Sequence, residues 1–509
     1  MSVRLKLSSL NPEERKQFQK DLVFKAKVKP FRGKRRWNFA PPSKDPILGF
    51  RIQDGLIRIP LAYGRKNFSD RIIPNMSHVS CPIKFTGSLY NNQIPFVEQG
   101  WATLQQKGHT TLALFTGSGK TVVSACLSTY DPGLTLILCE STILLSQWKN
   151  TFHAFTDAKV WVVGEPPPAE ANVIICMDTR FDKLPIEYLM KIKMVIVDEA
   201  HCFPTPTRFP CFLKLEPKYI IAATATPNRA DGLFAAIEAV CGKEKIVKIS
   251  TKPFNVMKYE TGVNVKIVQN KQGSPDWAKL VRHLCENEAR NKLITDIVVM
   301  NLNQGSKILI LTWRGDHVIY LERVIASMNI SVDRMSGNKR SYHDSDVLIG
   351  TIAKIGKAFD EKSICSDFNG IRLDLLLLVG SMNSVELLEQ VAGRVFRAQF
   401  PSIIHFCDNN HISRKHWSSA SEWYISRNGV VSIGKSPLAL GNRETPSSKT
   451  LALQQLSKYH QRVGSRQHVS NENTPVRLTL NVQPENYNSF IVLNINNGTL
   501  IQREPQLRN

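Results

Sequence analysis

The chain has 509 residues, 42% of them hydrophobic and 21% charged, as is ordinary for a folded protein of more than one domain. Its net charge of +23 is unusual and favours a polyanionic partner, DNA or RNA, although basic tails that only aid solubility are an alternative. The ten cysteines include no closely spaced pair of the zinc-ribbon kind. No apolar run is long enough for a secretory signal or a membrane span, so we expect no membrane partner.

The basic surplus is concentrated towards the two ends of the chain. Residues 1–45 hold 13 Lys and Arg against 4 Asp and Glu, and residues 413–470 hold 9 against 2. Within the first segment, residues 25–39 interleave these cations with aromatic residues. This mixture suits phosphate contact with base stacking, a nuclear localisation signal or a disordered tail, and the sequence does not separate the three.

Residues 86–250 alternate short apolar runs with stretches of helical length. The runs are LALF (112–115), TLILC (135–139), NVIIC (172–176), MVIVDE (194–199) and YIIAAT (219–224). Near-continuous apolar runs are typical of parallel strands that are covered on both faces. Their alternation with helices predicts a doubly wound α/β domain.

A second series of the same kind occupies residues 276–410. Its runs are KILILT (307–312), DVLIGT (346–351), LDLLLLVG (373–380) and SIIHFCD (402–408). Residues 251–275, which contain Pro253 and several polar residues, are predicted to be a linker. The predicted fold class is therefore α/β, with two tandem parallel-sheet lobes, a basic N-terminal region over 1–85 and a basic C-terminal extension over 411–509.

A phosphate-binding loop is predicted where the first apolar run meets a helix. Gly117 and Gly119 let backbone N–H groups curl around phosphates, and the positive end of the following helix points at them. Lys120 would reach the β- and γ-phosphates, and the Thr121 hydroxyl would hold Mg²⁺. The strict motif has Gly where this chain has Leu114, a departure that removes no phosphate ligand. The predicted ATP-binding residues here are Thr116, Gly117, Ser118, Gly119, Lys120 and Thr121.

An acidic pair at the end of MVIVDEAH (194–201) supplies the other half of a hydrolysis site. Asp198 would coordinate Mg²⁺ and Glu199 would polarise the attacking water. A solvated acidic turn is the alternative. Its position about 80 residues after the phosphate loop favours the catalytic interpretation.

The order of the motifs resembles that of superfamily 2 DExH-box helicases, which have two RecA-like lobes. The matching segments are TGSGKT (116–121), DEAH (198–201), TAT (224–226) and QVAGRVFR (390–397). The resemblance implies a nucleic-acid-dependent ATPase that uses ATP and Mg²⁺ and whose ATP bridges the lobes. It makes Glu199 the catalytic base, places Arg394 and Arg397 on the γ-phosphate, and gives His201 and Gln390 a part in coupling the lobes.

Weaker matches to the family add further candidates. Gln99 resembles the upstream glutamine that reads adenine, although a lone Gln is more often a surface residue. Gly356 to Asp360 resembles the fifth motif. The residues expected to contact the nucleic-acid backbone, because they follow predicted strand ends, are Thr142, Arg180, Trp313, Arg314 and Thr351. Trp313 is also a candidate for packing.

The resemblance extends to the helicases of African swine fever virus and the poxviruses, among them one that releases nascent transcripts. It implies a role in viral transcription or genome handling, with the viral transcription machinery as partner, in cytoplasmic factories and in the virion. Two alternatives remain open. One is a duplex translocase that does not separate strands, and the other is a structural nucleic-acid-binding protein with a vestigial nucleotide pocket.

Overall fold

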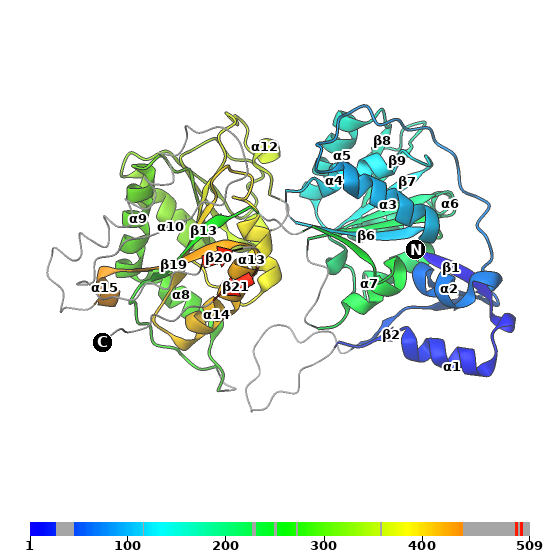
Figure 1. Ribbon diagram of the computed structural model, residues 1–509, viewed down its shortest axis with the longest axis horizontal. Helices are drawn as coiled ribbons and strands as arrows, with labels where there is room; N and C mark the ends of the chain where they lie inside the picture. Colours follow the sequence, from blue (N-terminus) through cyan, green and yellow to red (C-terminus); the bar gives the residue numbers. More distant parts are fainter. Residues whose placement is uncertain are drawn as a thin grey trace. The chain divides into compact units, whose positions relative to one another are not determined.

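The computed structural model describes residues 1–26, 45–115, 117–225, 231–248, 252–270, 273–356 and 359–440, and the backbone of 494–496 and 499–501. The chain divides into two compact units, Met1–Ile249 and Ser250–Asn509. Figure 1 draws the first in blue to green and the second in green to red. Most of the basic and aromatic segment 25–39 lies outside the described residues.

The first unit is built on a seven-stranded sheet in the order β12-β6-β11-β10-β7-β9-β8, with every strand pair parallel. The strands are β6 (His109–Leu114), β7 (Thr135–Cys139), β8 (Val160–Val162), β9 (Val173–Met177), β10 (Met194–Asp198), β11 (Tyr219–Thr224) and β12 (Lys245–Lys248). The helices are α3 (Ile94–Lys107), α4 (Lys120–Leu127), α5 (Thr142–Phe155), α6 (Ile186–Leu189) and α7 (Phe234–Cys241). Every residue of β7, β10 and β11 is buried, as their continuous apolar runs predict.

The described part of residues 1–85 is integrated into this unit. It contains β1 (Ser2–Lys6), α1 (Pro12–Asp21), β2 (Val23–Phe24), β3 (Ile47–Leu48), β4 (Arg51–Gln53), β5 (Leu56–Pro60) and α2 (Leu61–Phe68). Strands β1, β5 and β4 form an antiparallel sheet. Leu5 and Phe18 belong to the same hydrophobic core as Val195 of β10, and Arg4 pairs with Glu216 at 2.6 Å. The region set apart for its charge therefore shares the core of the first unit.

The second unit repeats the architecture with a parallel sheet in the order β15-β16-β14-β17-β18-β13-β19. The strands are β13 (Phe254–Glu260), β14 (Ile308–Thr312), β15 (Val332–Met335), β16 (Val347–Thr351), β17 (Leu375–Leu378), β18 (Ser402–Cys407) and β19 (Gly429–Lys435). The helices are α8 (Trp277–Glu286), α9 (Glu288–Leu302), α10 (Gly315–Ala326), α11 (Ile352–Gly356), α12 (Glu361–Ile364), α13 (Val385–Ala392), α14 (His411–Ser426) and α15 (Pro437–Leu440). The predicted fold class, two tandem RecA-like α/β lobes on parallel sheets, is confirmed.

The predicted boundaries of the second lobe are too narrow. The supposed linker, 251–275, contains β13, which pairs with β18 on one side and β19 on the other. Both α14 and β19 lie beyond residue 410, where the C-terminal extension was expected to begin. The sequence of β13, FNVMKYE, mixes buried and half-buried residues, so it lacks the continuous apolar run that predicted strands such as β7 and β10.

A buried ion pair joins elements of the second unit at the carboxyl ends of its strands. Arg290 of α9 contacts Asp408, which follows β18, with 2.8 Å between Nε and Oδ1, and each side chain is only 2% exposed. Thr261, which follows β13, donates to the same carboxylate oxygen at 2.8 Å. The pair therefore joins a helix to the ends of two neighbouring strands.

We expect Arg290→Leu to destabilise the second unit by about 3–5 kcal/mol, because it leaves the Asp408 charge buried without its partner. Lys292→Ala is the matched control on the same helix. Lys292 pairs with Asp296 at 3.2 Å, but both side chains are at least half exposed, so its loss should cost less than about 1 kcal/mol. Calorimetry of the full chain measures the unfolding temperature of both variants. Equal unfolding temperatures in Arg290→Leu and Lys292→Ala would contradict the role given to the Arg290–Asp408 pair.

Candidate functional site

Most of the predicted motifs of the first unit lie at the carboxyl ends of strands of its sheet. Because all the strands are parallel, their carboxyl ends meet at one edge, where ligands bind in open α/β sheets. Along the edge the order is β6, β11, β10, β7 and β9. The phosphate loop follows β6. The TAT segment begins at Thr224, the last residue of β11, and the DEAH segment begins at Asp198, the last residue of β10. Thr142 and Arg180 follow β7 and β9. The edge thus places the nucleotide motifs side by side and the nucleic-acid candidates next to them.

The phosphate loop has the backbone of an anion-binding turn. Gly117 and Gly119 adopt φ values of 90° and 83°, the left-handed region that only glycine occupies without strain. Helix α4 begins directly after them at Lys120, so its N-terminal N–H groups face the loop. Lys120 Nζ donates to the Leu114 carbonyl at 2.9 Å, and Thr121 lies in the first turn of α4. Thr116 lies outside the described residues.

A glutamine that the sequence analysis did not identify supports this loop. The buried Gln93 donates through Nε2 to the Ser118 carbonyl at 3.3 Å, and its Oε1 accepts from the Tyr90 N–H at 3.0 Å. A Cβ atom on Gly119 would lie 2.0 Å from Gln93 Nε2, so the Gln93 amide packs directly against this glycine, whose positive φ is what favours glycine at this position. The predicted adenine reader, Gln99, is exposed on α3, six residues after Gln93. The contact of Gln93 joins segments 25 residues apart, and no local pattern signals it.

Asp198, the predicted metal ligand, is a buried carboxylate at the end of β10. Its Oδ2 accepts from the indole Nε1 of Trp148 on α5 at 2.8 Å, and its Oδ1 accepts from the Glu199 N–H at 3.0 Å. Burial and the neighbouring Glu199 charge together raise the pKa of Asp198 to about 6, against the lowering effect of the Trp148 hydrogen bond. A nearby cation would stabilise the ionised form of this buried carboxylate. Asp198 and Thr121 therefore fit the oxygen ligands that Mg²⁺ prefers.

Glu199 and His201 connect the DEAH segment to the TAT segment. Glu199 has φ 47°, a left-handed conformation that is strained for a residue with a side chain. His201 Nδ1 lies 3.3 Å from Glu199 Oε2 and 3.0 Å from Thr224 Oγ1. Burial lowers the pKa of His201, but its contacts with Cys202 and Glu199 outweigh burial and raise it to about 10. A protonated His201 therefore faces the Glu199 carboxylate at neutral pH, and these contacts lie within the first unit.

The five nucleic-acid candidates differ in their surroundings. Thr142 is exposed at the first position of α5, while Arg180 is half-buried and donates to the Val163 carbonyl at 3.3 Å. In the second unit, Thr351 ends β16 and Arg314 precedes α10, where its guanidinium pairs with Asp316.

Trp313 packs inside the second unit. Its Nε1 donates to the Ser381 carbonyl at 2.8 Å, and its ring meets Trp277 edge-on at 6.1 Å. These contacts occupy the indole N–H and support the packing role that was the alternative for this residue.

The predicted arginines lie just after α13, which contains Gln390. Arg394 is buried and donates to the carbonyls of Gly356 at 2.7 Å and Phe359 at 2.8 Å. Arg397 forms an ion pair with Asp360, and burial lowers the pKa of this arginine. The structure thus brings both arginines onto the 356–360 segment that resembles the fifth motif.

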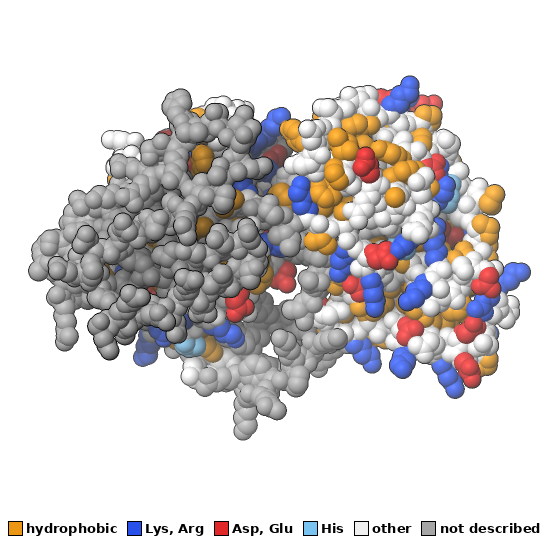
Figure 2. Space-filling view, viewed as in Figure 1, with side chains coloured by type: hydrophobic (Ala, Val, Ile, Leu, Met, Phe, Trp, Pro, Cys, Tyr) orange, Lys and Arg blue, Asp and Glu red, His pale blue; other side chains and the backbone are white. Residues whose placement is uncertain are grey.

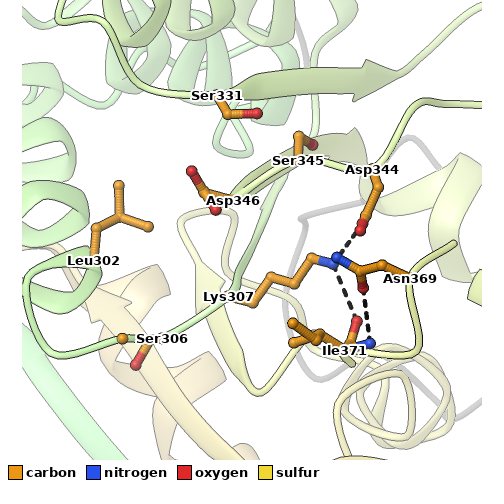
Figure 3. Close-up of a pocket in the computed structure, with 10 residues that line it drawn as sticks. Leu302, Ser306, Lys307, Ser331, Asp344, Ser345, Asp346, Asn369 and Ile371 are labelled. Atoms are coloured by element: carbon orange, nitrogen blue, oxygen red, sulfur yellow. Dashed lines mark hydrogen bonds and ion pairs between the residues drawn. The ribbon is translucent and has the colours of Figure 1, made fainter. Parts of the chain in front are cut away.

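A hollow of about 380 Å³ lies elsewhere in the second unit, at the amino ends of β14, β16 and β17 (Figure 3). There Lys307 Nζ contacts the Asp344 carboxylate and the Ile371 carbonyl. The lining residues are Leu302, Gly305, Ser306, Lys307, Ser331, Asp344, Ser345, Asp346, Asn369 and Ile371. None of the predicted site residues lines it.

Surface charge on the first unit is mixed. On the face drawn in Figure 2, Lys and Arg side chains lie among Asp and Glu, and apolar side chains gather on the upper part. Lys107 with Glu244 and Lys214 with Asp182 are examples of ion pairs in this unit. The basic surplus is therefore not gathered into one patch on this face. Among the described helices, none is both long and apolar enough to cross a membrane.

Comparison with known proteins links this arrangement to helicases. Residues 86–229 match the family described as "Type III restriction enzyme, res subunit". The chain is 28% identical over 425 residues to "Putative helicase 161L" of Invertebrate iridescent virus 6, covering 76% of this chain and 92% of that protein. It is 25% identical to "Putative helicase 055L" of Frog virus 3, covering 77% and 90%. It is also 23% identical to "Transcript termination protein A18" of Yaba-like disease virus, covering 69% and 78%.

Gln93→Ala and Gln99→Ala separate support of the phosphate loop from reading of the base. Gln93→Ala removes the hydrogen bond to the Ser118 carbonyl, so it should weaken ATP and GTP binding alike, by about 5- to 10-fold, or about 1–1.4 kcal/mol. Gln99→Ala should instead reduce the preference for ATP over GTP. Titration with fluorescent nucleotides measures both, and unchanged affinities in Gln93→Ala would contradict its role.

Trp148→Phe tests whether the indole hydrogen bond positions the Asp198 carboxylate for Mg²⁺. Losing the indole N–H frees the carboxylate to turn, and loss of such a supporting contact typically weakens metal binding about 10- to 100-fold. We expect weaker binding of Mg·ADP and unchanged binding of ADP in EDTA. Trp161→Phe is the control, because that indole donates to the Glu165 carbonyl at 3.0 Å, away from the DEAH segment. Equal behaviour of the two variants would contradict the prediction.

Proposed function

We propose that the chain is an ATP-driven motor that moves on DNA or RNA and separates its strands. One observation carries the proposal. The phosphate loop, the Asp198–Glu199 pair and Thr224 lie at the carboxyl ends of three adjacent strands, β6, β10 and β11. The similarity to helicases over most of the chain supports the same activity.

The first unit carries the chemistry of hydrolysis in this proposal. The N–H groups of the glycine loop and the start of α4 bind the phosphates, and Lys120 leaves the Leu114 carbonyl to neutralise their charge. Thr121 and Asp198 hold Mg²⁺, which would polarise the phosphate oxygens when bound. Glu199 orients the attacking water and accepts its proton. His201, held between Glu199 and Thr224, conveys the state of this site to the TAT segment.

The second unit contributes Gln390, Arg394 and Arg397, whose roles we infer from their match to the family motif. A guanidinium stabilises the negative charge that spreads over a transferring phosphoryl group. Arg397 is the better candidate for this contact, because its partner Asp360 is a side chain that can turn away. Arg394 donates to two backbone carbonyls, so it also fixes the 356–360 segment.

The similarity to a transcript termination protein of a poxvirus supports a more specific role. We propose that the motor acts in viral transcription, releasing transcripts, or in genome handling, together with the viral transcription machinery. Thr142, Arg180, Arg314 and Thr351 are the proposed backbone contacts, whereas Trp313 contributes packing. Virion and cytoplasmic-factory locations are part of this proposal.

Activity assays separate this proposal from its alternatives. ATP hydrolysis is measured with and without DNA or RNA, and strand displacement on DNA, RNA and hybrid duplexes with 3′ or 5′ overhangs. A motor shows stimulated hydrolysis and displacement, whereas a duplex translocase shows stimulated hydrolysis without displacement. Tight polynucleotide binding with no hydrolysis would identify a structural protein and overturn the proposal.

Glu199→Gln is the decisive variant for the chemistry. The amide keeps the size of the side chain but cannot accept a proton, so turnover should fall about 10²- to 10⁴-fold while ATP still binds. Single-turnover hydrolysis and nucleotide titration measure the two effects separately. Turnover at the unsubstituted rate would refute Glu199 as the base.

A further inference from the structure

Arg208 joins three loops at the carboxyl edge of the first sheet. Its Nε lies 2.7 Å from Asp178 Oδ2, and its Nη1 lies 3.1 Å from Glu140 Oε2. The same Nη1 donates to the Cys202 carbonyl at 3.2 Å. The two carboxylate side chains are only 4% and 9% exposed, respectively, whereas Arg208 itself is 30% exposed.

The partners of Arg208 lie next to residues already assigned to the nucleic acid. Glu140 follows β7 and stands two residues before Thr142, and Asp178 follows β9 and stands two residues before Arg180. Each acidic residue therefore sets the position of a loop that carries a candidate backbone contact.

The third partner belongs to the hydrolysis site. Cys202 ends the short turn that begins after Glu199, and its N–H donates to the Glu199 carbonyl at 2.8 Å. A change in the backbone at Glu199 therefore changes the position of the carbonyl that Arg208 holds.

We infer that Arg208 is a positioning residue that couples ATP hydrolysis to nucleic-acid binding, an inference that rests on the proposed function. Its guanidinium connects the DEAH turn to the two loops that precede Thr142 and Arg180. Movement of the turn during the ATP cycle shifts both loops together, and nucleic acid on those loops in turn stabilises one position of the turn.

The chemistry of the partners explains why an arginine serves here. Two carboxylates with so little exposure need a counter-charge, because an unpaired buried charge is costly. A planar guanidinium presents several N–H groups in a fixed fork and stays charged, so it can serve two carboxylates and a carbonyl at once. A lysine ammonium is a compact charged point and cannot present the same fixed fork of N–H groups to all three acceptors.

The experiment uses the full chain and four proteins: unsubstituted, Arg208→Gln, Arg208→Lys and Lys214→Ala. Lys214 lies six residues further on and pairs with the exposed Asp182 at 2.7 Å, so it controls for loss of an ordinary surface ion pair. The readouts are the ratio of stimulated to basal ATP turnover with a single-stranded DNA or RNA oligonucleotide, the oligonucleotide concentration at half-stimulation, and the unfolding temperature.

We expect the stimulation ratio to fall at least fivefold in Arg208→Gln, to be partly restored in Arg208→Lys, and to stay unchanged in Lys214→Ala. Basal turnover and stimulated turnover falling together, with the ratio preserved, would show a structural role and overturn the inference. A full ratio in Arg208→Gln would also overturn it. Absence of stimulation in the unsubstituted chain would overturn the proposed function itself, and the inference with it.

Asp178→Asn gives a second test in case Arg208→Gln does not fold. It removes the charge that Arg208 contacts through Nε and keeps the size of the side chain, so the same loss of stimulation is expected. Combined with Arg208→Gln, it should add little, because both changes break one interaction. Additive losses in the double variant would show that the two residues act separately and would overturn the coupling role.

Discussion

The parallel pairing of β6, β11 and β10 is the constraint on which the candidate site depends. In a parallel sheet every strand ends at the same edge. Segments about 80 residues apart in the sequence therefore lie close together because each follows its own strand. The side chains of these strands are buried on both faces of the sheet, so only the strand ends can contact a ligand. The phosphate loop and the acidic pair are neighbours for this reason.

The second feature of this edge is its concentration of carboxylates with little exposure. Asp198, Asp178 and Glu140 follow or end three neighbouring strands, and each has a specific donor: an indole for Asp198 and one guanidinium for the other two. A buried carboxylate without a donor is costly in free energy, so each of these carboxylates keeps its donor, and the donor fixes the orientation of the side chain. The second unit has a similar arrangement at the carboxyl ends of its strands, where Arg290 and Asp408 join a helix to two strand ends.

Sequence patterns predicted those parts of the molecule whose signal is local. Continuous apolar runs identified β7, β10 and β11, and glycines next to a lysine identified the phosphate loop. Strand β13 was not predicted, because its partners β18 and β19 lie 147 and 175 residues further along the chain and its own sequence has no continuous apolar run. The roles of three further residues were not predicted for a related reason: Gln93, Trp148 and Arg208. Each acts through a contact with a distant segment, and nothing in its immediate neighbourhood marks it.

The adjacency of β10 and β7 gives a physical route between the two halves of the edge. Helix α5 starts with Thr142 and carries Trp148 six residues later, a rise of about 9 Å along the helix axis. The same rigid element therefore holds a candidate nucleic-acid contact at its start and the Asp198 carboxylate further along. Arg208 spans the neighbouring loops from the other direction. In the proposed motor, a displacement at the DEAH turn therefore meets two stiff connections to the loops proposed to contact nucleic acid, one through a helix and one through a guanidinium. Coupling in this unit does not require the sheet itself to deform.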